Sequence, residues 1–205
     1  YKVVGNVRFY DRKEIKDILA YLNYLINPED TVSFERILNV PKRGIGESTL
    51  QKLRDYANKN EISLSKSIEN LDEINNLSDR VKKQINNFKE IINDLKSFAL
   101  QGPSETISKT LELTGYKDEL VKEGTLDSQM RLENLDELLT SAFEFENLYE
   151  EDIEDPFTVL RDYLESIALF TDSDDVDKED RILLMTLHNA KGLEFPVVFM
   201  TGMEE

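Results

Sequence analysis

The sequence predicts a mainly α fold, with a small α/β portion formed by the two ends of the chain. Apolar residues recur at helical spacing through most of the interior, which is typical of helices that bury one face. The ends differ from the interior. Short apolar runs at Ile182–Leu187 and Val197–Met200 are bounded by turn-forming residues, as in the buried strands of a parallel sheet.

The first forty residues contain two predicted strand pieces and two predicted helices. Tyr1–Val4 and Val7–Tyr10 are expected to form short strands on either side of a turn. Apolar residues within 15–26 share one helical face, and Asn27 ends this helix because the residue before a proline avoids the helical region. Thr31 is the expected cap of a second, short helix. The residues that this helix would bury are Phe34, Ile37 and Leu38.

A glycine turn, Gly44-Ile45-Gly46, follows the short helix, and another helix beginning near Ser48 would complete a helix-hairpin-helix-like element. This arrangement suits phosphate, because glycines allow close backbone approach and the free amides at a helix start attract an anion. Such a contact recognises the nucleic-acid backbone and is independent of base sequence. The alternative is a plain glycine turn between two core helices. The candidate contact residues are Lys42, Arg43, Gly44, Ile45, Gly46, Ser48 and Thr49.

Apolar stripes predict four further helices in the rest of the chain. One is capped near Ser78 and covers residues 81–95. The next opens at Gly102-Pro103-Ser104 and stops at Gly115, following the usual placement of proline at a helix start and glycine at its end. The last two stripes lie at residues 132–142 and 160–168.

Acidic residues are concentrated towards the carboxyl end. The net charge is −17, yet residues 1–60 carry 11 Lys and Arg against 8 Asp and Glu, whereas residues 144–180 carry 15 Asp and Glu against two cations. Because DNA affinity depends on local phosphate contacts, a DNA site is expected in the first third. Residues 150–155 are expected to form a solvated loop and residues 172–180 a mobile linker. This linker lacks the glycine and closing glutamate of an EF-hand, so no metal site is predicted.

Three absences bound the cellular setting and the chemistry. The sequence has no cysteine, no apolar run of about 20 residues that would span a bilayer, and no signal-like start. These features predict a reducing, cytoplasmic setting without a membrane partner. The chain starts with Tyr1 and both ends look like strands, so we expect a piece of a longer protein. No Gly-x-x-x-x-Gly-Lys-Ser/Thr loop occurs, so this piece alone is expected to hold neither ATP nor Mg²⁺ and to hydrolyse no ATP.

The carboxyl-terminal loop carries the most specific motif. It contains the single histidine of the chain, a lysine beside a glycine, and a glutamate. A lone histidine by itself most often belongs to a core. However, Thr186–Phe199 closely resembles motif V of the PcrA/UvrD/Rep group of superfamily 1 DNA helicases. Gly5–Leu22 resembles the segment before the accessory insertion of those enzymes, with Asn6 in place of a second glycine. The resemblance covers essentially the whole chain and is also strong at Asn39–Leu50.

This resemblance implies a fragment of an ATP-dependent 3′-to-5′ DNA helicase that acts in repair or replication. Residues 29–172 would be a helical accessory insertion, with residues 1–28 and 173–205 belonging to the second RecA-like domain. The glycine turn would contact duplex DNA, and the full protein would use ATP, Mg²⁺, single-stranded DNA and its remaining helicase domains. The motif V residues would be Thr186, His188 and Lys191 at the single-strand groove and coupling loop, and Gly192 and Glu194 at the nucleotide.

Two other functions stay open from the sequence. The chain could belong to the helicase subunit of a recombination helicase–nuclease, which shares similar motifs. It could instead be a protein-interaction module that binds a repair or transcription partner, with a purely structural glycine turn. A nuclease domain in the full reading frame would indicate the first function. Loss of duplex binding with partner capture retained would indicate the second.

Overall fold

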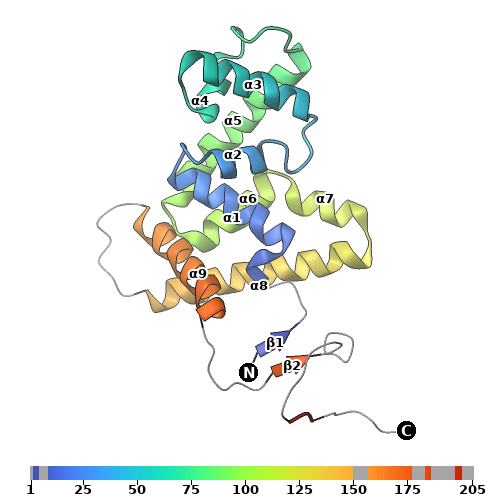
Figure 1. Ribbon diagram of the computed structural model, residues 1–205, viewed down its shortest axis with the longest axis vertical. Helices are drawn as coiled ribbons and strands as arrows, with labels where there is room; N and C mark the ends of the chain where they lie inside the picture. Colours follow the sequence, from blue (N-terminus) through green and yellow to red (C-terminus); the bar gives the residue numbers. More distant parts are fainter. Residues whose placement is uncertain (1, 5–8, 150–156, 177–182, 186–196, 200–205) are drawn as a thin grey trace.

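The computed structural model describes residues 2–4, 9–149, 157–176, 183–185 and 197–199. Within them the chain is mainly α, as the apolar spacing predicts, and its helices stack into an elongated body (Figure 1). In chain order the elements are β1 (Lys2–Val4), η1 (Phe9–Asp11), α1 (Lys13–Ile26), α2 (Thr31–Leu38), α3 (Glu47–Asn60), α4 (Leu64–Ser67), η2 (Ile68–Asn70), α5 (Asp79–Ala99), α6 (Pro103–Leu113), α7 (Tyr116–Glu123), α8 (Leu126–Leu148), α9 (Thr158–Val176) and β2 (Leu183–Met185).

Helix α1 lies at the centre of the helical body and contacts α2, α5, α6, α8 and α9. Its apolar residues recur every three or four positions and form one buried face. Ile15, Ile18, Tyr21 and Leu22 are fully buried. The family resemblance places a domain boundary between residues 28 and 29. In the structure, however, the buried residues on the two sides of this boundary belong to one continuous hydrophobic core. That boundary stays a prediction.

The connection between α1 and α2 ends one helix and caps the next. α1 ends before Asn27, as the following proline predicts. The cap of α2 is Asp30 rather than Thr31, and its side chain accepts the N–H groups of Val32 and Ser33 at 3.0 and 3.1 Å. The prediction of Thr31 is wrong by one residue, because Asp30 already satisfies these amides and Thr31 becomes the first helical residue. The predicted core residues Phe34, Ile37 and Leu38 are buried.

The predicted strand at Val7–Tyr10 is wrong at its carboxyl end. Phe9–Asp11 form the 3₁₀ helix η1, and residues 5–8 lie outside the described part. The rings of Phe9 and Tyr10 meet edge to face, with centroids 5.1 Å apart, and both pack against the helical core. Consecutive side chains of a strand point to opposite faces, so a strand would not bring both rings to one surface.

The predicted starts and stops of the middle helices are confirmed. The side chain of Ser78 accepts the N–H of Val81 at the start of α5. Pro103 occupies the first turn of α6, and Gly115 follows that helix with a φ of +74°. Packing between helices joins these elements into one core. For example, the ring of Phe34 on α2 contacts the ring of Phe88 on α5, with centroids 6.2 Å apart.

Helix α9 extends further than the apolar stripe at residues 160–168 predicts. It continues to Val176, so residues 172–176, which we expected in a mobile linker, are helical. Once a packed segment has nucleated a helix, each further residue adds a hydrogen bond at little cost, and this outweighs the acidic local composition. Residues 177–182 and the predicted acidic loop at residues 150–155 lie outside the described part.

Strands β1 and β2 come from opposite ends of the chain and pair in parallel. The register places Lys2, Val3 and Val4 opposite Leu183, Leu184 and Met185. Parallel pairing needs a long crossover, and here the helical body is that crossover. Among the helices that the structure describes, none has the length and apolar character needed to cross a membrane.

Candidate nucleic-acid interface

We call residues Asn39–Gly46, which join α2 to α3, the glycine loop. Asn39 directly follows α2, and its side-chain oxygen accepts the backbone N–H groups of Arg43 and Ile45 at 2.8 and 3.1 Å. Gly44 lies between these two residues with a φ of +75°, a left-handed conformation that glycine adopts without steric cost. Asn39 therefore closes the loop on itself, as asparagine side chains commonly do in turns.

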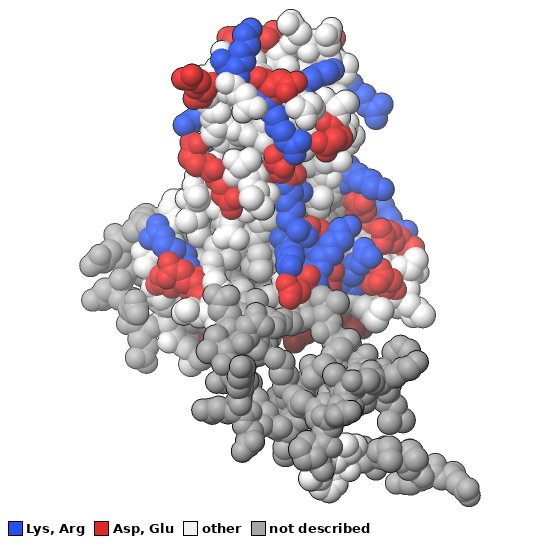
Figure 2. Space-filling model, viewed as in Figure 1, with Lys and Arg blue, Asp and Glu red and all other residues white. Residues whose placement is uncertain are grey.

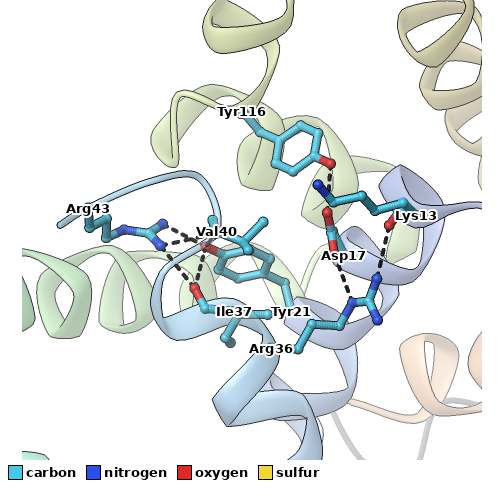
Figure 3. A network of polar contacts seen from close by, with 8 residues as sticks. All are labelled: Lys13, Asp17, Tyr21, Arg36, Ile37, Val40, Arg43 and Tyr116. Carbon is cyan, nitrogen blue, oxygen red and sulfur yellow. Dashed lines mark hydrogen bonds and ion pairs between the residues drawn. The ribbon is translucent and has the colours of Figure 1, made fainter. Parts of the chain in front are cut away.

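Arg43 stabilises the glycine loop from within (Figure 3). Its Nη1 lies 2.9–3.3 Å from four carbonyl oxygens, those of Ile37, Leu38, Val40 and Pro41. Its guanidinium carbon lies 5.3 Å from the centroid of the Phe88 ring, within the range of a cation–π interaction. A helix leaves its last carbonyls without helical partners. Arg43 satisfies those at the end of α2, so its charge is directed into the protein.

Tyr21 of α1 joins the same network. Its hydroxyl donates to the carbonyl oxygen of Val40 at 2.5 Å and accepts a hydrogen bond from Nη2 of Arg43 at 2.6 Å. Burial raises the pKa of Tyr21 to about 12, although the neighbouring guanidinium opposes this rise. The hydroxyl is therefore protonated at neutral pH and ties α1 to the glycine loop. Tyr21 was not predicted as a site residue, because a tyrosine within an apolar stripe indicates only a core position.

The seven predicted contact residues divide into two groups. Ile45 and Thr49 are buried, with 3 % and 7 % of their surface exposed, and they contribute to packing. Arg43 is engaged within the loop. The exposed members are Lys42, Gly44, Gly46 and Ser48. The structure therefore gives the two adjacent cations of the loop different roles, with Lys42 facing solvent and Arg43 facing inward.

Helix α3 begins at this exposed edge of the loop. Gly46 is its N-cap residue, and the Gly46 carbonyl accepts the N–H groups of Thr49 and Leu50 at 2.9 and 3.1 Å. Within the part of the chain that the structure describes, no group accepts a hydrogen bond from the backbone N–H of Glu47 or of Ser48. The first amides of a helix and its dipole together favour an anion. The start of α3 therefore offers two backbone donors to a phosphate.

An ion-pair triad of Glu35, Arg54 and Glu47 connects α2 with α3. The Arg54 guanidinium donates to both carboxylate oxygens of Glu35, from Nε at 2.9 Å and from Nη2 at 2.7 Å. Its Nη1 donates to Glu47 at 2.8 Å. The hydrogen bond from Arg54 lowers the pKa of Glu35, and these carboxylates in turn raise the pKa of Arg54. Arg54 is thus held by two carboxylates, one on each helix that flanks the glycine loop.

A second polar cluster lies where α1, α2 and α7 meet (Figure 3). The carboxylate of Asp17, 2 % exposed, accepts hydrogen bonds from Nε of Arg36 and from the Tyr116 hydroxyl, both at 2.8 Å. Burial and the Asp17 carboxylate raise the pKa of Tyr116. A cavity of about 200 Å³ adjoins this cluster and the glycine loop. Its lining includes Lys13, Lys42, Glu119 and Glu123, so it favours neither sign of ligand charge.

The surface of the helical body carries both signs of charge. In the view of Figure 2, several Lys and Arg side chains gather in the lower middle of the helical body, bordered by Asp and Glu, and elsewhere the two signs are interspersed. Any nucleic-acid contact on this face is therefore local. In the described residues no group of three or more His, Cys, Asp or Glu side chains could hold a metal ion.

The predicted motif V residues lie outside the described part of the chain. They are Thr186, His188, Lys191, Gly192 and Glu194. Strand β2 ends at Met185, directly before this motif. The assignments to single-stranded DNA and nucleotide therefore stay predictions.

Comparison with known proteins identifies the protein family of the chain. Residues 1–205 match the UvrD-like helicase C-terminal domain, and the chain belongs to this family. It is 42 % identical over 206 aligned residues to the ATP-dependent DNA helicase PcrA of Staphylococcus aureus and, equally, to that of Staphylococcus epidermidis. Each alignment covers 100 % of this chain and 28 % of the relative, so the chain spans under a third of the length of these helicases.

Proposed function

We propose that the whole protein is an ATP-dependent 3′-to-5′ DNA helicase and that this region supplies its duplex-contacting arm. The family membership and the relatives named as ATP-dependent DNA helicases support the class of enzyme. Residues 29–172 would form the accessory insertion, with α1 packed against it, and residues 1–28 and 173–205 would belong to the second RecA-like domain. In the whole protein, this region and the remaining helicase domains would jointly bind ATP and Mg²⁺.

The glycine loop and the start of α3 form a helix-hairpin-helix-like element that would contact the DNA backbone. One observation carries this proposal: the amides of Glu47 and Ser48 are available on an exposed edge, next to a loop that Arg43 and Asn39 hold rigid. A preorganised loop loses little conformational freedom on binding. Lys42 would add one exposed positive charge. Because these groups contact phosphate, duplex binding would be independent of base sequence.

Motif V would connect this arm to the ATPase cycle. Thr186, His188 and Lys191 would lie at the single-stranded DNA, and Gly192 and Glu194 at the nucleotide. One loop that contacts two ligands couples their binding free energies. This chain alone would hydrolyse no ATP.

The duplex contact is tested by fluorescence anisotropy of a labelled blunt duplex with this 205-residue chain. K42E should weaken binding several-fold at low salt. The log–log salt slope of the parent should be about −1 to −2, since Lys42 is the exposed cation of the glycine loop. The matched control is K59E, the same charge change in the last turn of α3, about 20 Å away along the helix. Equal binding by K42E, K59E and the parent would reject the loop as a duplex site and favour the structural glycine turn.

A further inference from the structure

We propose that Arg54 is a positioning residue for this phosphate contact: it neutralises Glu47, whose carboxylate would otherwise repel the DNA backbone at the start of α3. The inference rests on the proposed duplex function of the glycine loop. It adds an electrostatic control of that loop by a residue two helical turns away.

Glu47 creates a conflict at the start of α3. It is the first residue of the helix, and a carboxylate at that position stabilises a helix through the helix dipole. The same carboxylate lies beside the amides that would bind phosphate. Because the carboxylate and the phosphate are both negatively charged, they would repel each other. Glu47 has 77 % of its side chain exposed, so it is not removed from that surface by burial.

Arg54 resolves this conflict by geometry. It lies seven residues after Glu47, close to two turns of the helix, so both side chains leave α3 on the same side. Its Nη1 donates to Oε1 of Glu47 at 2.8 Å. Its other edge binds both oxygens of Glu35 on α2, which fixes the plane of the guanidinium. The charges of Glu35, Arg54 and Glu47 add up to −1, whereas the two carboxylates without Arg54 would carry −2.

The chemistry requires an arginine for the geometry and only a cation for the charge. Arginine presents five donors in a planar fork and can bind two carboxylates at once, whereas lysine is a point charge on a flexible stem. R54K should therefore keep most of the neutralisation while losing the two-point contact with Glu35. R54Q removes the charge and leaves a side chain of similar polarity.

A purely structural role for Arg54 makes different predictions. If Arg54 only clamped α2 against α3, E35Q would break the clamp and weaken duplex binding as much as R54Q does. Under our proposal E35Q leaves Arg54 beside Glu47 and makes the triad neutral, so duplex binding stays equal or tightens. The two roles therefore predict opposite results for the same variant.

The experiment compares the parent with R54Q, R54K, E35Q, E47Q and R54Q/E47Q by anisotropy of a labelled blunt duplex, with circular dichroism as a check of folding. At low salt R54Q should weaken binding about two- to fivefold, the size expected for exposed ion pairs, and the effect should fade as salt is raised. R54K should bind within about twofold of the parent. E47Q in the R54Q background should restore parental binding.

Even if R54Q weakens binding, two further results would overturn the proposal. One is an R54Q/E47Q double variant that binds as weakly as R54Q, because the defect would then not come from the charge of Glu47. The other is E35Q binding as weakly as R54Q. The K42E variant separates this inference from the function on which it rests: if K42E weakens binding and R54Q does not, only the role of Arg54 fails. If K42E binds like the parent, the duplex site itself fails.

Discussion

The Tyr21 hydroxyl lies 2.6 Å from Nη2 of Arg43, and this contact joins the central helix α1 to the glycine loop. Both groups also bind the carbonyl of Val40, Tyr21 at 2.5 Å and Arg43 at 3.0 Å. The partly buried guanidinium of Arg43, the buried phenol of Tyr21 and the end of α2 therefore depend on one another. The loop proposed to contact DNA is held in shape by residues that do not contact DNA.

The two adjacent cations of the loop should differ in their effect on stability. R43A removes a charged donor from several carbonyls and should lower the free energy of unfolding by about 2–4 kcal/mol, since bonds from charged groups are among the stronger ones and their loss leaves acceptors unsatisfied. K42A, at an exposed neighbouring position, should change it by about 0.5 kcal/mol or less. Urea unfolding followed by circular dichroism measures both. Similar losses for the two variants would contradict the inward placement of Arg43.

Tyr21 should make the stability of the protein depend on alkaline pH. Burial raises its pKa from 10.0 to about 12, so the protonated form is favoured in the folded state. Its contribution is complete below pH 10 and is lost as the pH rises towards about 12. A shift of about two units corresponds to about 2–3 kcal/mol. The free-energy advantage of the parent over Y21F, measured by urea unfolding, should therefore shrink between pH 8 and pH 11. A constant difference would exclude this linkage.

The buried Asp17 carboxylate should matter far more than an exposed one. D17N weakens the hydrogen bonds that the buried Asp17 carboxylate accepts from Arg36 and Tyr116, and it should cost about 2–3 kcal/mol of unfolding free energy, because bonds to a charged group are among the stronger ones. The matched control is D11N, which breaks the exposed ion pair with Lys16 and should cost about 0.5 kcal/mol or less. Chemical unfolding of the two variants provides the comparison, and a small effect of D17N would show that the cluster is not coupled to the core.

Two glycines should respond differently to alanine. Gly102 has a φ of +120°, and an added Cβ would lie 2.5 Å from Oε1 of Glu146, which accepts the N–H of Ser104. G102A should therefore cost about 2–3 kcal/mol from backbone strain and displacement of Glu146. A Cβ at Gly46 meets no atom within 4 Å, and its φ is −89°, so G46A should cost about 1 kcal/mol or less. Thermal or urea unfolding distinguishes the two, and equal losses would contradict the strained backbone at Gly102.

Local sequence signals predicted the longer helices and several of their ends, but they predicted neither α4 nor α7. The proline after Asn27, the serine at position 78 and the glycine at position 115 each act on their own backbone, so their effect is visible without the fold. The errors occurred where packing competes with local preference. Phe9 and Tyr10 leave the strand conformation to bring both rings to the core, and α9 runs through acidic residues 172–176 because a packed segment precedes them.

The glycine loop shows the same division within a candidate site. Its glycines and cations were predicted as a phosphate-binding turn, but no local pattern separates an inward arginine from an outward lysine. That choice depends on a ring from α5 and a hydroxyl from α1, which lie far away in the sequence. Arg54 was missed for a related reason, since its partner Glu35 is on another helix.

The mainly helical fold, the resemblance to a helicase family and the position of the glycine loop can all be read from the sequence alone, because periodicity, turn residues and motifs are local properties of the chain. The folded structure is needed to show which loop residues face solvent, that Tyr21 and Arg43 close the loop, and that Arg54 pairs with Glu47 and Glu35. A side chain takes its direction from the lowest free energy of the whole packed core. Buried carbonyls and carboxylates from several helices must all find partners, and no single stretch of sequence contains that information.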